Sequence, residues 1–151
     1  MKLYLDTSVY GGFYDKEFEK DTRVLFKYII QNNVSVSVSD VLRAELDKSP
    51  EKVRLVLNQI SNTNYVGLSK QASDLASIYI KEGALGKKNL NDARHIAIAT
   101  IEKVDVIASW NFKHMIHFLK VELYNAINIR EGYRAITIHS PTDLIKSLEL
   151  S

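Results

Sequence analysis

The sequence predicts a three-layer α/β/α domain in which helices cover both faces of a parallel central sheet. Short strand-like segments alternate with amphipathic helical segments along the chain, and this alternation is typical of parallel sheets with right-handed crossovers. The chain has 151 residues, 46% of them hydrophobic and 25% charged, which suits one globular domain. We therefore expect a single domain over residues 1–151.

The first elements follow from side-chain periodicity. Residues 2–5 (KLYL) form a short apolar strand, and residues 21–31 a helix whose apolar side chains recur on one face. The segment 34–39 (VSVSVS) alternates β-branched and small polar residues, which predicts a strand. A helix is predicted over 40–48.

The middle of the chain continues the alternation. A helix is predicted over 51–60, with Ser49 as its N-cap and Pro50 at the first helical position. A weak strand at 64–68 and a helix over 70–83 follow.

The last third completes the pattern. It predicts a helix over 91–103, a buried strand over 105–109, a helix through 119–129 and a strand over 134–138. The motif SPTD at 140–143 then begins a final helix, in the manner of Ser49 and Pro50.

Composition narrows the function classes. There are no cysteines, which excludes disulfides, thiolate zinc sites and cysteine nucleophiles. Neither a signal peptide nor an apolar run of about 20 residues is evident, so we expect a cytoplasmic protein with no membrane partner. The net charge of +2 permits a phosphate-bearing partner without requiring one.

Four oxygen-bearing side chains fall where predicted strands end or where the next helices begin. These candidate catalytic residues are Asp6, Glu45, Asp92 and Asn111. Ligand sites of open parallel sheets form outside the carboxyl ends of the strands, and helical side chains lean back toward the helix N-terminus. We therefore expect these side chains to meet at one edge of the sheet.

Three of the four are acidic, and closely packed carboxylates repel one another unless a cation neutralises them. Oxygen ligands suit Mg²⁺ or Mn²⁺, so the predicted metal ligands are Asp6, Asp92 and Glu45. Such a metal activates water and stabilises charge on a phosphodiester, which is the chemistry of a metal-dependent nuclease.

Each of these residues also has a simpler explanation. Asp6 begins an Asp-Thr-Ser sequence suited to a surface turn, and Asn111 is a common turn residue. Asp92 can complement a helix dipole, and Glu45 can lie on a solvated helix face. The position of Asp6 at the end of a central strand favours function there, while both explanations stay open for the other three.

Together these segments resemble a PIN domain, the metal-dependent ribonuclease fold of VapC-type toxins, over nearly the whole chain. The similarity lies in four stretches: YLDTSVYGG (4–12), SVSVSDVLRAEL (35–46), NDARHIAIAT (91–100) and DVIASWNFKHM (105–115). By this resemblance Asp6 is the first acid of the family, Glu45 its glutamate and Asp92 its third acid.

The resemblance implies an endoribonuclease that is the toxin of a type II toxin–antitoxin pair. It further implies an RNA substrate, an antitoxin partner and a homodimer. The sequence departs from the family at Asn111, where an aspartate is common. An amide brings no charge, which leaves three carboxylates, enough for one metal, and lowers the expected affinity for a second.

Four further residues are candidates for supporting the site or binding substrate. Thr7 and Ser8 follow the first acid and would fix the turn or support that acid. His95 shares a helical face with Asp92, so it is either a positioning or phosphate-contacting residue or a half-buried structural histidine. Trp110 either stacks on a base or packs in the core.

Two histidines, His114 and His117, lie three residues apart, and we read the surrounding FKHMIHFL (112–119) as a helix with a mixed face rather than a metal site. The adjacent Lys87 and Lys88 are candidates for contact with RNA phosphates.

Two other functions compete with the nuclease. A catalytically weak or inactive PIN-like domain would bind RNA or a protein partner, and Asn111 favours it. A phospho-acceptor domain of similar fold would need paired acids after the first strand, and a phosphatase would need Asp-x-Asp there. This sequence has the single acid Asp6, and Ser8 stands where the second aspartate of Asp-x-Asp would be.

Overall fold

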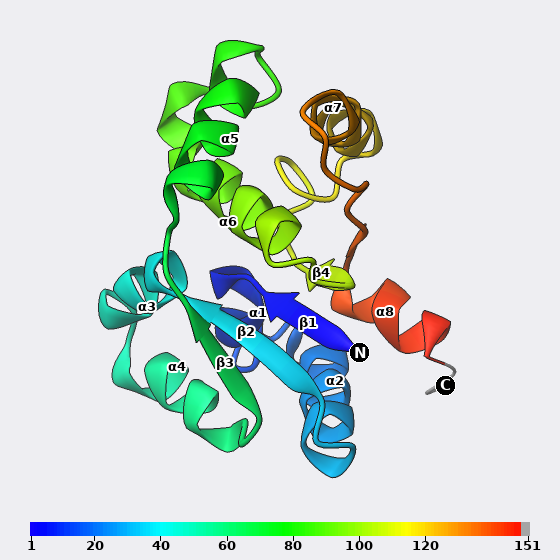
Figure 1. Cartoon of the computed structure of the whole chain (residues 1–151). Coiled ribbons are helices and arrows are strands. Elements are labelled where there is room, and N and C mark those ends of the chain that lie inside the picture. Colours follow the sequence, from blue (N-terminus) through cyan, green and yellow to red (C-terminus); the bar gives the residue numbers. More distant parts are fainter. Residues whose placement is uncertain (149–151) are drawn as a thin grey trace.

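The computed structural model describes residues 1–148 and contains a parallel sheet with the strand order β3-β2-β1-β4-β5 (Figure 1). The strands are β1 (Lys2–Leu5), β2 (Ser35–Ser39), β3 (Thr63–Val66), β4 (Val106–Ala108) and β5 (Ile138–His139). The chain runs outward from β1 to β3 and then crosses to the other side of β1 for β4 and β5. This switch lies beside the carboxyl end of β1, where such sheets form sites.

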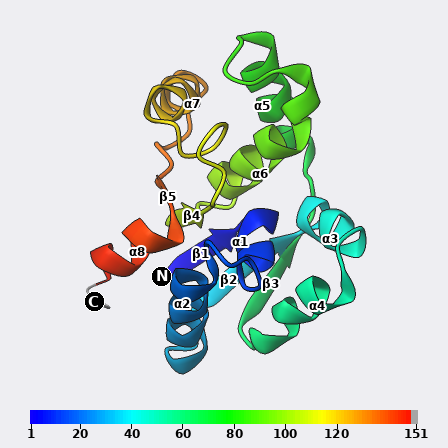
Figure 2. The same ribbon diagram turned by 180° about the vertical axis from the view of Figure 1, so that it is seen from behind.

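Helices cover both faces of the sheet, which confirms the predicted three-layer architecture. The α-helices are α1 (Thr7–Gly12), α2 (Glu19–Gln31), α3 (Asp40–Asp47), α4 (Glu51–Arg54), α5 (Lys70–Lys81), α6 (Leu90–Ile101), α7 (Phe118–Arg130) and α8 (Pro141–Ser147), and the 3₁₀-helices are η1 (Leu55–Gln59) and η2 (Lys87–Asn89). Helices α5, α6 and α7 gather on one side of the sheet, above it in Figure 1. Helices α1, α2, α4 and α8 lie on the other side, and the view from behind in Figure 2 agrees.

Alternation along β1 divides the apolar interior into two cores. Leu3 and Leu5 belong to the core under α2, together with Phe26. Tyr4 points to the opposite core, which holds Ile96 of α6. Because side chains alternate along a strand, Tyr4 faces the helix that carries two of the predicted site residues.

Between β1 and β3, two local predictions were wrong and one helix was missed. Helix α1 was not predicted, because Asp-Thr-Ser also suits a turn. The segment 51–60 is α-helical only to Arg54 and then 3₁₀, a common tightening at helix ends. Pro50 occupies the N-cap position of this helix and not its first helical position, and Ser49 does not cap it, since the hydroxyl of Ser49 donates to the carbonyl of Glu45.

The predicted helix over 112–119 is instead a series of turns before α7. Asn111 causes this change, because its side-chain Oδ1 accepts from the amide of His114 at 3.0 Å. Its carbonyl also accepts from the amides of Met115 and Ile116, both at 3.1 Å. Side chains such as asparagine compete in this way with helical hydrogen bonding. His114 and His117 therefore do not share a helix face.

Strand β5 is shorter than the predicted 134–138. Strand β4 has three residues, so it pairs only with Ile138 and His139 in the ladder. Upstream, the side chain of Asn125 takes over the pairing of Ile136, accepting from its amide at 2.7 Å and donating to its carbonyl at 3.1 Å. Among residues 1–148, no helix has the length and apolar character to cross a membrane.

Candidate active site

Asp6 lies at the carboxyl end of β1 and is 4% exposed. Its Oδ1 accepts from the hydroxyl of Ser8 at 2.5 Å, and its Oδ2 from the hydroxyl of Ser109 at 2.6 Å. Although Asp6 occupies the N-cap position of α1, its side chain makes no capping bond. The carboxylate is therefore held between the ends of β1 and β4 rather than used to cap the helix.

Burial raises the pKa of Asp6 above its usual range, although the two serine donors oppose this effect. The nearby carboxylate of Asp92 raises the pKa of Asp6 further. An ionised Asp6 thus lies in a site where its negative charge is poorly solvated and repelled.

Glu45 of α3 is the end of a buried hydrogen-bond chain. Its Oε1 accepts from the hydroxyl of Thr7 at 2.7 Å and lies 2.5 Å from Nε2 of His95. The other ring nitrogen, Nδ1, lies 2.5 Å from the hydroxyl of Tyr4, which is 2.7 Å from Oγ of Ser39. Burial alone would raise the pKa of Glu45, but the hydrogen bonds from His95 and Thr7 hold it below its usual range.

Asp92 and Asn111 meet across the site. The side-chain amide of Asn111 donates to Oδ2 of Asp92 at 3.3 Å. Burial raises the pKa of Asp92, His95 opposes this, and the charge of Glu45 adds to the rise. An aspartate at position 111 could not donate this bond, because an ionised carboxylate only accepts. Asn111 therefore supports Asp92 in a way that the expected acid would not.

A cavity of about 420 Å³ opens beside these residues, and Glu45, Asp92, Asn91 and Lys88 line it. Within residues 1–148, no group of three or more acidic or histidine side chains is spaced to hold a metal ion. The predicted carboxylates thus lie within electrostatic range of each other without forming a three-ligand group.

The donor chemistry of this site fits a hard divalent cation. Mg²⁺ is commonly held by one or two carboxylates, with waters and substrate phosphates completing its shell, so three protein ligands are not required. Burial raises the pKa of both Asp6 and Asp92; the charge of Asp92 raises that of Asp6 further, and the charge of Glu45 raises that of Asp92. A cation held by these carboxylates would offset these effects.

Trp110 packs into the protein and is 8% exposed. Its indole stacks on Phe18 with ring centroids 4.3 Å apart, and its Nε1 donates to Thr22 at 2.9 Å. Its backbone amide donates to Oγ of Ser8 at 2.9 Å, and Ser8 in turn holds Asp6. The ring therefore has a packing role, while the backbone supports the first acid.

Sequence reasoning missed Ser109, Tyr4 and Ser39. Ser109 is fully buried, donates to Asp6 and accepts from the amide of Asn111 at 2.9 Å. A signal was present for the two serines, because Ser39 ends β2 and Ser109 directly follows β4, so both lie at the carboxyl edge of the sheet, where ligand sites form.

The fold of this chain is similar to those of several solved structures. The chain is similar to VapBC-1 from nontypeable Haemophilus influenzae, with 16% identity, a TM-score of 0.60 and coverage of 94% of this chain and 99% of that one. It is also similar to VapBC2 from Rickettsia felis bound to a DNA fragment from its promoter, with 13% identity, a TM-score of 0.59 and coverage of 93% and 98%. A third similar structure is DNA-bound VapBC from Salmonella typhimurium, with 17% identity, a TM-score of 0.55 and coverage of 93% and 98%.

No protein-family model matches the chain, and no curated protein matches it in sequence. The likeness in structure extends over nearly all of this chain and of the similar chains. The chain therefore has the VapC-like PIN-domain fold that its sequence motifs predict.

Proposed function

We propose that this protein is a divalent-metal-dependent endoribonuclease and the cytoplasmic toxin of a toxin–antitoxin pair. The observation that carries the proposal is Asp6, a buried carboxylate at the switch point of the sheet, held by two serine hydroxyls with Asp92 nearby. Burying a carboxylate beside another one is costly, and a bound cation offsets that cost.

Asp6 and Asp92 would hold a Mg²⁺ or Mn²⁺ ion, with Glu45 beside them. When bound, such an ion supplies positive charge at the phosphodiester and lowers the pKa of water. The chain itself holds the carboxylates in place, through Ser109 and Ser8 at Asp6 and through His95 at Glu45. The lowered pKa of Glu45 keeps it ionised, so that it can accept a hydrogen bond from an attacking water.

Positive charge beside the acidic site supports a nucleic-acid substrate. Lys88 lines the same cavity as Asp92. The pKa of His114 is lowered by partial burial and then by the charges of Lys120, Lys113 and Lys88, so three lysines act on this one side chain. Lysines in this position can neutralise RNA phosphates on either side of the cleaved bond.

The direct test is cleavage of single-stranded and structured RNAs by purified protein, with Mn²⁺, Mg²⁺ or EDTA. We expect metal-dependent cleavage that EDTA stops and that Asp6→Asn abolishes. Asp105→Asn is a matched control, because Asp105 precedes β4 at the opposite edge of the sheet and accepts from the amide of Lys2. Cleavage that survives Asp6→Asn, or that needs no metal, would refute the proposal.

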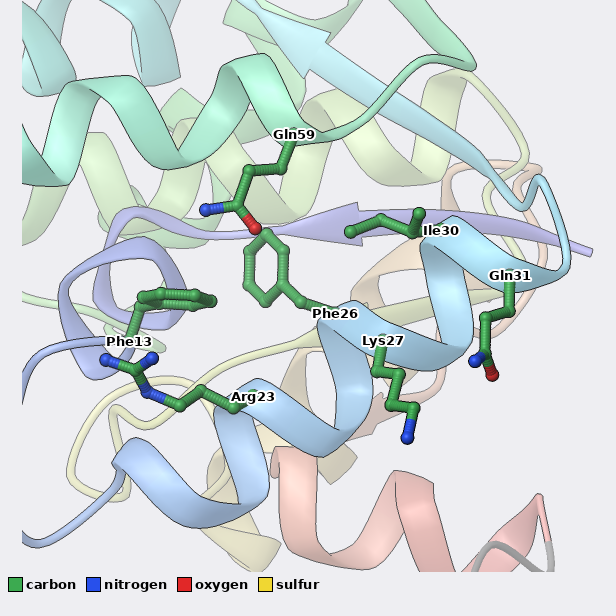
Figure 3. Close-up of a pocket in the computed structure, with 7 residues that line it drawn as sticks. All are labelled: Phe13, Arg23, Phe26, Lys27, Ile30, Gln31 and Gln59. Atoms are coloured by element: carbon green, nitrogen blue, oxygen red, sulfur yellow. The ribbon is translucent and has the colours of Figure 1, made fainter.

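The antitoxin would dock on an apolar cavity of about 360 Å³ between α2 and η1 (Figure 3). Phe13 and Phe26 meet edge to face at 5.5 Å in this cavity, and the guanidinium of Arg23 lies 4.2 Å from the Phe13 ring centre. Lys27 adds a second positive charge at the rim. An apolar segment flanked by acidic residues matches this surface, so we propose such a segment of the antitoxin as its occupant.

A small upstream gene whose product begins with a DNA-binding segment would supply the antitoxin for this test. Co-expression should yield a complex that Ile30→Asp weakens, because Ile30 lines the cavity and is 44% exposed. Val24→Asp is the control, since Val24 is also exposed on α2 but lies outside this cavity. Equal effects of the two substitutions would exclude the cavity as the docking site. Light scattering of the free protein would check the proposed homodimer.

A catalytically silent domain that binds RNA or a protein is the second candidate. The neutral Asn111, which donates to Asp92 where an acid is expected, favours it. Binding of RNA without cleavage under every metal condition would support this candidate over the nuclease.

A further inference from the structure

The site described above is supported by a buried chain of hydrogen bonds that starts in the sheet and ends at Glu45. Tyr4, Ser39 and His95 are each at most 1% exposed, so solvent does not compete for these bonds. The chain joins β1, the end of β2, α6 and α3, four elements that meet only in the folded protein.

The protons in this chain can be assigned. Oγ of Ser39 accepts from the amide of Leu42 at 3.0 Å, which leaves the serine proton free to point at the Tyr4 hydroxyl. The Tyr4 proton then points at Nδ1 of His95, which accepts it. The imidazole proton is therefore on Nε2, where it donates to the carboxylate of Glu45.

The opposite tautomer, with the imidazole proton on Nδ1, leaves hydrogen-bonding groups without suitable partners. If Nδ1 carried the only imidazole proton, a bare Nε2 would lie 2.5 Å from Oε1 of Glu45, and two acceptors would face each other. The Tyr4 hydroxyl would then donate to Ser39, whose own proton would lack an acceptor among the hydrogen bonds of residues 1–148. Burial also raises the pKa of Tyr4, so its hydroxyl stays protonated and able to donate.

We propose that Tyr4 and His95 are positioning residues: Tyr4 fixes the Nε2–H tautomer of His95, and His95 fixes the carboxylate of Glu45. With Thr7 on the same Oε1, Glu45 is presented to the cavity that it shares with Asp92 in one orientation. Carboxylates and histidines at metal sites are commonly oriented by such outer partners. This inference rests on the proposed nuclease function for its catalytic consequence but not for its structural content.

Nitrogen NMR of the metal-free protein tests the structural content. In the parent protein, the ring shifts of His95 should report a protonated Nε2 and an accepting Nδ1 near neutral pH. Tyr4→Phe should remove the hydrogen bond at Nδ1 and allow both tautomers. Tyr79→Phe is the matched control, because Tyr79 is also fully buried and donates to Asn128, away from the site. A proton on Nδ1 in the parent, or His95 shifts unmoved by Tyr4→Phe, would overturn the proposal.

Steady-state kinetics of RNA cleavage test the catalytic consequence of this positioning. Tyr4→Phe should lower kcat for RNA cleavage by about 10–100-fold with little change in KM, the usual effect of losing an outer partner, while Tyr79→Phe should not. His95→Gln can still donate to Glu45 and should retain more activity than His95→Leu; equal losses would overturn the positioning role. If the parent cleaves no RNA, the proposed function fails, yet the nitrogen shifts still decide the assignment of the tautomer.

Discussion

Two buried serines, Ser37 in β2 and Ser109 directly after β4, allow a matched test of how the site is held. Ser109 and Ser37 are both fully buried, so removing either hydroxyl deletes the same atom from a similar environment. Ser109 donates to the carboxylate of Asp6 at 2.6 Å and accepts from the amide of Asn111 at 2.9 Å. The hydroxyl of Ser37 has no hydrogen-bond partner within residues 1–148.

The hydrogen-bond partners set the expected magnitudes. A bond to a charged group contributes about 1.5–3 kcal/mol and a neutral one about 0.5–1.5 kcal/mol. Ser109→Ala should therefore lower the free energy of unfolding by about 2–4 kcal/mol, since both bonds are lost. Ser37→Ala removes a hydroxyl that is already unpaired, so its effect should be near zero or stabilising.

Urea unfolding of the two variants and the parent at neutral pH would measure this difference. Ser109→Ala should also lower RNA cleavage, because only Ser8 would then hold Asp6, whereas Ser37→Ala should leave cleavage unchanged. Equal losses of stability in the two variants would refute the reasoning, because burial rather than hydrogen bonding would then control both.

Four more predictions concern the acids and the packing around them. Burial raises the pKa of Asp6, and such a carboxyl destabilises the folded chain as pH rises through that pKa. Asp6→Asn should therefore stabilise the metal-free protein by about 0.5–2 kcal/mol at neutral pH. Urea unfolding should show this gain at neutral pH and no gain at acidic pH. For the same reason the affinity for Mn²⁺, measured by calorimetry, should fall with decreasing pH before an ordinary aspartate would protonate. Asn111→Asp should tighten Mn²⁺ binding by about ten- to thirtyfold, since a carboxylate and a divalent cation about 4 Å apart attract by ~2 kcal/mol even in water; unchanged affinity would place residue 111 outside the metal site. Gly12→Ala should cost about 1–3 kcal/mol through overpacking, because its Cβ would lie 2.7 Å from Nε1 of Trp110, whereas Gly11→Ala, with nothing within 4 Å, should not destabilise the fold in thermal melts.

The parts of the fold that could be predicted are those that local sequence determines. The sequence of β2 alternates between two residue types, and α2 and α6 each have an apolar face. These patterns show which side chains are buried, so it was predictable that these segments are a strand and two helices. The position of Asp6 was predictable as well, because it directly follows the first strand. Helix α1 was not predictable in the same way, since Asp-Thr-Ser suits both a turn and a helix start.

The parts that could not be predicted depend on contacts between distant segments. Ser109 meets Asp6 across 103 residues of sequence, and Tyr4 meets His95 across 91. Neither serine nor tyrosine carries a pattern that reveals its partner. The hydrogen bond from Asn111 to Asp92 was likewise hidden, because the sequence shows only that an amide stands where an acid is expected.

The short strand β5 also determines how the sheet can meet other chains. The amides of Ile107 in β4 and of Ser109 just after it donate to the carbonyls of Thr137 and His139, so the backbone groups of Ile136 point away from β4. Asn125 satisfies both of those groups, as a neighbouring strand would. An unpaired strand invites aggregation or domain swapping, and here a single side chain occupies the place of the invading strand. A further strand therefore cannot pair with Ile136 on this side of the sheet unless it displaces the side chain of Asn125.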